Sequence, residues 1–194
     1  MYEVIGNTQS RAFRVMWMLE ELGEEYTHTA AKPHSEEAKS ANPSGKIPAL
    51  RDGDDVITDS TAIITYLADK HGKLTHPAGT IARARQDALT HTILDEMDSV
   101  LWVATRHKFI LPEDRRVPDI GDAMKWEFSN HAARFADCIE GEFLMGDTMT
   151  VPDILATHCL NWAYGAKFPI EDQRLLDYAK RMRGRDAFKR ATAR

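Results

Sequence analysis

Two short segments in the first half of the chain carry residue types from which an anion-binding site can be built. Residues 42–50 read Asn-Pro-Ser-Gly-Lys-Ile-Pro-Ala-Leu, and residues 59–61 read Asp-Ser-Thr. Because Asp, Ser and Thr are favoured N-cap residues, the second segment predicts the start of a helix over 60–70. A helix N-terminus presents free N–H groups and the positive end of its dipole, which suit an anion. The alternative for this segment alone is an ordinary helix cap.

Motifs for several other chemistries are absent from the sequence. It has no HExxH, no Cys and His residues at zinc-binding spacing, no GxSxG, no P-loop and no GxGxxG. Its eight histidines are scattered and do not form a ligand set. We therefore expect neither a metal site nor a nucleotide cofactor.

The first elements of the chain alternate between strand and helix. Residues 2–5 predict a strand, residues 6–9 break it, and a helix follows that ends at Gly23. Residues 26–31 predict a second strand, parallel to the first because a right-handed βαβ crossover joins them. One face of the helix carries apolar residues at helical spacing, namely Val15, Met18, Leu19 and Leu22.

A hairpin and a third helix complete the first half. Residues 47–50 and 56–58 flank the turn-rich tetrad Asp-Gly-Asp-Asp, which predicts two antiparallel strands. The helix over 60–70 follows them. The order β-α-β and then β-β-α is that of a thioredoxin-like α/β domain, a small sheet with helices on both faces. We assign this N-terminal domain to residues 1–71.

Only helical periodicity follows the first domain. Residues 72–79 contain two glycines and one proline, which is typical of a linker. Residues 80–194 predict an all-α C-terminal domain with helices over 81–109, 119–140, 151–163 and 172–182. The third of these starts with a capping box in which the Asp153 carboxylate can reach back to the Thr150 amide. Three aromatic residues are predicted to lie in the core, namely Trp126, Trp162 and Tyr164.

The composition predicts a cytoplasmic protein without a nucleic-acid or membrane partner. Hydrophobic residues make up 43% of the 194 residues, and the net charge of −5 comes without a basic cluster. No apolar run approaches the roughly 20 residues that span a bilayer, and the first residues lack the order of a signal peptide. Cys138 and Cys159 form no CxxC pair and are expected to be buried free thiols.

The two segments of the first half resemble the glutathione site of cytosolic glutathione S-transferases. The motif of that family reads NPxGKVPxL, followed further along by Glu or Asp and then Ser, and here Ile47 replaces the Val. Residues 11–23 resemble the first helix of the family, and residues 150–153 resemble the capping box of its C-terminal domain. The resemblance covers nearly the whole chain and implies the glutathione transferase fold, with glutathione as co-substrate.

The resemblance also implies a role for individual residues. Pro48 is expected to be a cis proline that turns the main chain of Ile47 outward, where it pairs with the cysteinyl unit of glutathione. The hydroxyl and amide of Ser60 are expected to bind the γ-glutamyl carboxylate, while Asp59 meets the ammonium group. Two side chains are candidates for the glycyl carboxylate, or alternatively solvated residues: Lys46 and His34.

In this family a Tyr, Ser or Cys between the first strand and first helix activates the glutathione thiol. A hydrogen-bond donor there, together with the helix N-terminus, lowers the thiol pKa so that thiolate prevails. This loop has no Cys, as in bacterial members of the non-Cys type, and the candidates in order are Asn7, Ser10 and Thr8. Ser10 is alternatively the N-cap of the first helix.

The resemblance implies an electrophile pocket between the two domains and, usually, a homodimer. Trp102, Arg106 and His107, near the end of the helix over 81–109, are candidates to line that pocket. The alternatives are a core position for the aromatic residue and a solvated face for the Arg-His pair.

The favoured function is the conjugation of glutathione to small hydrophobic electrophiles. A glutathione-dependent disulfide reductase, peroxidase or isomerase is the first alternative. A non-catalytic glutathione-binding scaffold is the second, because Asn7 replaces the usual Tyr, Ser or Cys.

Overall fold

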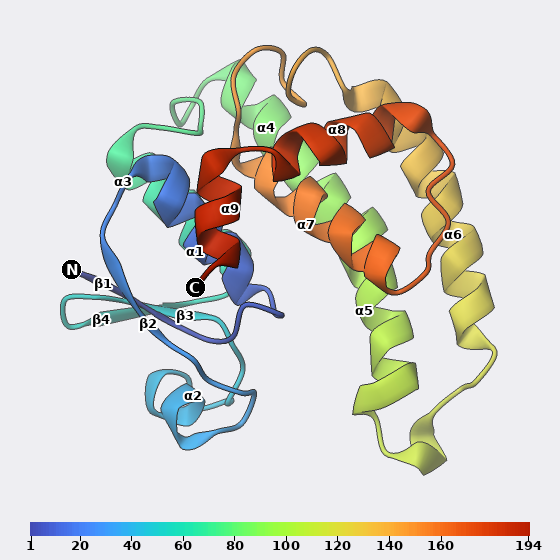
Figure 1. Cartoon of the computed structure of the whole chain (residues 1–194), viewed down its shortest axis with the longest axis horizontal. Coiled ribbons are helices and arrows are strands. Elements are labelled where there is room, and N and C mark those ends of the chain that lie inside the picture. The colour runs from blue at the N-terminus through green and yellow to red at the C-terminus, as the bar shows by residue number, and fades with distance from the viewer. The chain divides into compact units, whose positions relative to one another are not determined.

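Four short strands form one mixed sheet in the order β2-β1-β3-β4 (Figure 1). The computed structural model describes residues 1–194. β1 (Tyr2–Ile5) pairs in parallel with β2 (Tyr26–Thr29), as the βαβ crossover requires, and antiparallel with β3 (Ala49–Asp52). β4 (Asp55–Thr58) pairs antiparallel with β3 and completes the predicted hairpin.

Helices cover both faces of this sheet, which confirms the predicted thioredoxin-like arrangement. α1 (Ala12–Leu22) and α3 (Ser60–His71) pack together on one face, and α2 (Glu36–Ala41) lies against β1 and β3 on the other (Figure 1). α1 ends where the sequence predicts, because Gly23 adopts the left-handed conformation at φ 77° and its N–H bonds to Leu19.

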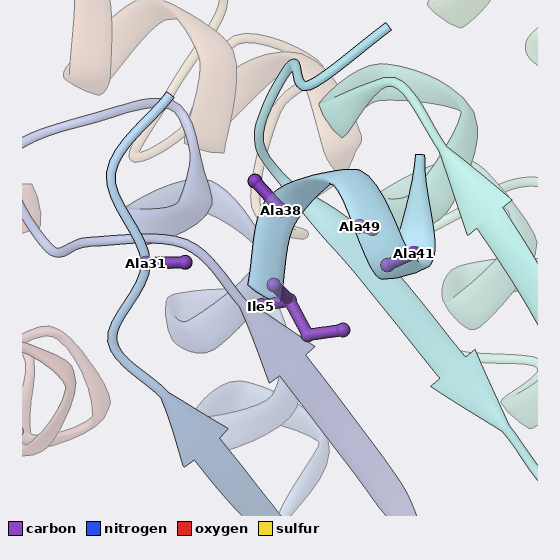
Figure 2. Close-up of a cluster of buried hydrophobic side chains, with 5 residues drawn as sticks. All are labelled: Ile5, Ala31, Ala38, Ala41 and Ala49. Atoms are coloured by element: carbon purple, nitrogen blue, oxygen red, sulfur yellow. The ribbon is translucent and has the colours of Figure 1, made fainter. Parts of the chain in front are cut away.

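Small side chains allow α2 to lie close to the sheet. Because an alanine projects only a methyl group, two backbones separated by alanines can approach closely. This packing fixes the segments on either side of α2, and Ile47 packs against the same cluster. Figure 2 shows the five buried residues at this contact, which are Ile5, Ala31, Ala38, Ala41 and Ala49.

The last helix of the chain packs on the first one. The structure divides into two compact units, residues 1–77 together with 182–194, and residues 78–181. α9 (Asp186–Thr192) therefore lies in the first unit, where the Phe188 ring contacts the rings of Phe13 and Trp17, each at 5.0 Å between centroids. The prediction from the sequence placed these residues in the helical C-terminal domain. The domain boundaries at 71 and 80 stay a prediction.

The second unit is built from helices (Figure 1). The predicted helix over 81–109 forms, but two π-helical stretches interrupt its α-helical turns. In chain order its parts are α4 (Ile81–Ile93), η1 (Leu94–Asp98), α5 (Ser99–Thr105) and η2 (Arg106–Ile110). The remaining elements are η3 (Glu113–Arg115), α6 (Ile120–Phe135), η4 (Ala136–Cys138), α7 (Val151–Gly165) and α8 (Gln173–Arg183).

α7 is the most buried helix of the second unit, and a buried carboxylate holds its first turn. The Asp153 carboxylate accepts hydrogen bonds from the Thr150 N–H at 2.8 Å and the Leu144 N–H at 3.0 Å. It also accepts one from the Tyr178 hydroxyl at 2.7 Å. Burial raises the pKa of Asp153, and these hydrogen bonds oppose the shift. The backward reach of Asp153 to Thr150 is as predicted.

The three aromatic residues predicted to lie in the core of the second unit are not buried there. Trp126 on α6 is 72% exposed and Tyr164 on α7 is 78% exposed, while Trp162 is half-buried. Their spacing fits a helix, but spacing alone does not say which face meets the core. Cys159 is a buried free thiol as predicted, whereas Cys138 is only half-buried. None of the helices combines the length and the apolar character that crossing a membrane requires.

Candidate functional site

The Ile47–Pro48 peptide bond is cis and lies against the loop that follows β1. A Cβ atom at Gly6 would stand 2.7 Å from the Cβ of Ala12 and 3.4 Å from the Cβ of Ile47. The backbone of Gly6 also has φ 147°, which side-chain-bearing residues rarely adopt. Glycine is therefore required here, because the first loop, the start of α1 and the proline segment meet at this point.

The main chain of Ile47 is unpaired. Neither its N–H nor its carbonyl forms a hydrogen bond within the protein, although Pro48 and the β3 residue Ala49 that follow it are buried. An unpaired, extended main chain beside a sheet can pair with the main chain of a bound peptide. The cis bond and the open backbone are the features that the resemblance implies for Ile47 and Pro48.

Hydrogen bonds within the segment 42–46 shape the loop before the cis bond. The Asn42 side chain accepts from the Ser44 N–H and donates to the Lys46 carbonyl, both at 3.1 Å. The chain turns at Gly45, with φ 68°, and its carbonyl accepts from the His34 N–H at 2.7 Å. The structure thus brings together the two candidates for the glycyl carboxylate, and both side chains are exposed.

The start of α3 uses Asp59 as its cap. One oxygen of the Asp59 carboxylate accepts from the N–H groups of Thr61 at 2.8 Å and Ala62 at 3.1 Å. Ser60, the first residue of the helix, is only 3% exposed, and its own N–H donates to no group of the protein. A free amide thus remains at the positive end of the helix dipole.

Arg14 was not predicted as part of the site. It belongs to α1, is fully buried, and its Nη1 donates to the Ser60 hydroxyl oxygen at 3.3 Å. A signal was present in the sequence, because Arg14 stands in the same helical row as Met18 and Leu22, which are apolar and buried. A charged residue in an apolar row of a helix indicates a buried charge that needs a partner.

Hydrogen bonds hold the loop between β1 and α1 against the end of β2 and the residues that follow it. The Gly6 N–H donates to the Thr29 carbonyl at 3.1 Å, and His28 Nε2 donates to the Gly6 carbonyl at 2.7 Å. The amide of Asn7 donates to the Ala31 carbonyl at 3.3 Å. Asn7 therefore has one side-chain N–H already engaged and one that remains.

The other two loop candidates differ in how their hydroxyl groups are used. The Ser10 hydroxyl donates to the Asn7 carbonyl at 2.7 Å and accepts from the Ala12 N–H at 3.1 Å, which is a capping role. The Thr8 hydroxyl forms no hydrogen bond in the protein. The main-chain N–H groups of Asn7, Thr8 and Gln9 are also unpaired, so the loop presents several donors at the start of α1.

The candidates for an electrophile pocket lie in the second unit. Trp102 belongs to α5, while Arg106 and His107 belong to η2. Trp102 and Arg106 are exposed. His107 is half-buried, and its Nδ1 accepts the Val117 N–H at 3.1 Å. The role of these three residues stays a prediction.

Solved structures with the same fold are glutathione transferases. One, from Methylococcus capsulatus, is 23% identical, with a TM-score of 0.87 over all of this chain and 98% of its own. Gtt2 from Saccharomyces cerevisiae is 19% identical, with a TM-score of 0.85 over 97% of this chain and 99% of its own. A theta class enzyme from Xanthomonas axonopodis, with glutathione bound, is 23% identical. Its TM-score is 0.78 over 98% of this chain and 96% of its own.

The fold of this chain is accordingly the glutathione transferase fold. A family model described as glutathione S-transferase, N-terminal domain, matches residues 10–70. The matched part of the chain includes the proline segment and the start of α3. The resemblance stated from the sequence is confirmed.

Proposed function

We propose that the protein binds glutathione with its first unit, activates the thiol and conjugates it to small electrophiles. The observation that carries this proposal is the unpaired main chain of Ile47 beside the cis bond, which abuts the donor-rich loop at Gly6. The solved theta class relative with bound glutathione adds support, because it has the same fold.

Each part of the tripeptide has a candidate partner. The main chain of Ile47 pairs with the cysteinyl unit, and Ser60 at the start of α3 binds the γ-glutamyl carboxylate. The second carboxylate oxygen of Asp59, which does not cap the helix, is the acceptor for the glutamyl ammonium. Lys46 and His34 provide the cationic and polar side chains for the glycyl end.

Thiol activation rests on donors rather than on a protein nucleophile. The remaining side-chain N–H of Asn7, the Thr8 hydroxyl and the unpaired loop amides are donors for a thiolate at the start of α1. Each hydrogen bond to the charged form lowers the thiol pKa from its free value of about 8.5. Ser10 contributes by holding the loop, since its hydroxyl is already used twice.

Trp102, Arg106 and His107 are the proposed residues for recognising the electrophile. An aromatic face and a guanidinium would favour a flat or anionic substrate. A glutathione-dependent disulfide reductase or peroxidase is the second candidate, because Asn7 and Thr8 stand where better-known transferases have Tyr, Ser or Cys. We also expect a homodimer, which light scattering after gel filtration tests.

Calorimetric titration with glutathione, followed by ultraviolet absorbance of the bound thiolate across pH, tests the proposal. We expect binding and a thiol pKa below that of free glutathione. Ser60→Ala should weaken binding, while Ser99→Ala, at an exposed serine of α5, is the matched control and should leave it unchanged. No binding at millimolar glutathione would overturn the proposal. Binding without a lowered thiol pKa would leave only a scaffold.

A further inference from the structure

Arg14 is the only fully buried charged side chain of the first unit. Removing an ion from water costs several kcal/mol, so a buried guanidinium is retained only where the surroundings compensate for it or where it serves a purpose. Its Nη1 lies 3.3 Å from the Ser60 hydroxyl oxygen, at the first residue of α3. A positive charge thus stands directly behind the proposed carboxylate site.

The chemistry of the two groups fixes the direction of this hydrogen bond. A guanidinium carries only donors, so the Ser60 oxygen must be the acceptor. The hydroxyl hydrogen of Ser60 therefore points away from Arg14, and it donates to no other group of the protein. The Ser60 N–H donates to no group either. Both donors of Ser60 remain for an anion, and the charge of Arg14 makes the hydroxyl a stronger donor.

We infer that Arg14 is a positioning residue that orients the Ser60 hydroxyl toward the γ-glutamyl carboxylate and tunes the site for a carboxylate. The inference rests on the proposed function. Arg14 does not touch the ligand, because the buried Ser60 hydroxyl stands in between as the group that accepts from Arg14 and donates onward. Its contribution to affinity therefore passes through Ser60, and it has no effect on the thiol.

A double-mutant cycle tests this dependence, with S-methylglutathione as the probe, since it keeps the carboxylates but has no thiol. Ser60→Ala removes the hydroxyl that links Arg14 to the carboxylate. Arg14→Met removes the charge and keeps an unbranched apolar side chain in its place. Hydrogen bonds to charged groups contribute enough that each change should raise the Kd about tenfold. Because the two residues act in series, the double variant should also show about a tenfold rise rather than about a hundredfold one.

Additive losses in the cycle, or an unchanged Kd for Arg14→Met, would overturn the inference. Arg14→Lys keeps the charge and should recover part of the affinity. If Arg14→Met does not fold, Arg14→Lys replaces it in the double-mutant cycle with Ser60→Ala. Failure of Arg14→Lys to bind more tightly than Arg14→Met would also contradict the proposed role. Wild-type protein that fails to bind S-methylglutathione would overturn the proposed function itself.

A control variant separates positioning from structural support. Met18→Ala opens a cavity one turn further along the same buried row of α1, away from Ser60. It should lower the melting temperature while leaving the Kd unchanged. With glutathione as substrate, Arg14→Met should raise KM and leave both kcat and the thiol pKa in place. A shift of the thiol pKa in Arg14→Met would show that Arg14 acts on the loop instead.

Discussion

The Ser10 hydroxyl donates to the Asn7 carbonyl at 2.7 Å, and this bond closes the loop between β1 and α1. The same oxygen accepts the Ala12 N–H, so both capacities of the hydroxyl are used inside the protein. A hydroxyl engaged in this way supports the start of a helix. It has no hydrogen left for a sulfur atom, whereas Thr8 in the same loop does.

Replacing the two hydroxyl residues of this loop should therefore have different effects. Ser10→Ala removes a cap and should cost about 1 kcal/mol of unfolding free energy, with the thiol pKa of bound glutathione unchanged. Thr8→Val keeps the shape and removes a free donor, so the thiol pKa should rise with little loss of stability. Urea unfolding and the absorbance of the thiolate across pH measure the two quantities. The opposite pattern would make Ser10 the activating residue.

Gly6→Ala should disturb both stability and binding. The added methyl would stand 2.7 Å from the Cβ of Ala12, and alanine rarely adopts a φ of 147°. Overpacking and strain together should cost roughly 1–3 kcal/mol and displace the loop. Gly121→Ala is the matched control, since its methyl meets nothing within 4 Å in α6 and should stabilise the helix slightly. Equal melting temperatures for the two variants would contradict the prediction.

Acid should loosen α9 from α1. Burial raises the pKa of Glu20, but hydrogen bonds from Arg190, Arg194 and Tyr26 outweigh it and lower the pKa below its usual value. A lowered carboxyl pKa adds stability that is present above the unfolded pKa and is lost as pH falls through the folded one. Protection of α9 amides from hydrogen exchange should therefore fall between about pH 5 and pH 3. Glu20→Gln should lower the protection of α9 amides at neutral pH and make that protection less dependent on pH.

The two residues of the capping box at α7 should differ in what their loss costs. Thr150→Ala removes one hydroxyl and should cost about 1 kcal/mol. Asp153→Ala leaves the buried N–H groups of Leu144 and Thr150 without an acceptor, and each unsatisfied group costs roughly 1–3 kcal/mol. In denaturant unfolding, the free energy of unfolding of Asp153→Ala should therefore be well below that of Thr150→Ala. Equal losses would mean that water replaces the carboxylate.

The elements of the sheet could be predicted from the sequence because local chemistry dictates them. Turn residues at 52–55 set the hairpin, and Gly23 ends α1 because it tolerates the left-handed conformation. The roles of individual side chains were harder to predict from the sequence. The engagement of Ser10 within its own loop depends on where the Asn7 carbonyl points, which no spacing rule reports.

Features that depend on long-range packing escaped prediction for a different reason. Arg14 reaches Ser60 across two helices that are distant in sequence, so only the tertiary structure joins them. α9 is short and has few apolar residues, and ion pairs such as Arg190 with Glu20 at 2.7 Å add to the contacts of Phe188. The exposed Trp126 shows that an aromatic residue at helical spacing can face solvent.

The return of α9 to α1 has a consequence for how the chain is made. A ribosome releases residues in order, and the aromatic faces of Phe13 and Trp17 emerge long before Phe188, which covers them. The first unit therefore cannot finish its core until α9 has been synthesised. Fragments that stop before residue 182 should expose these rings and aggregate.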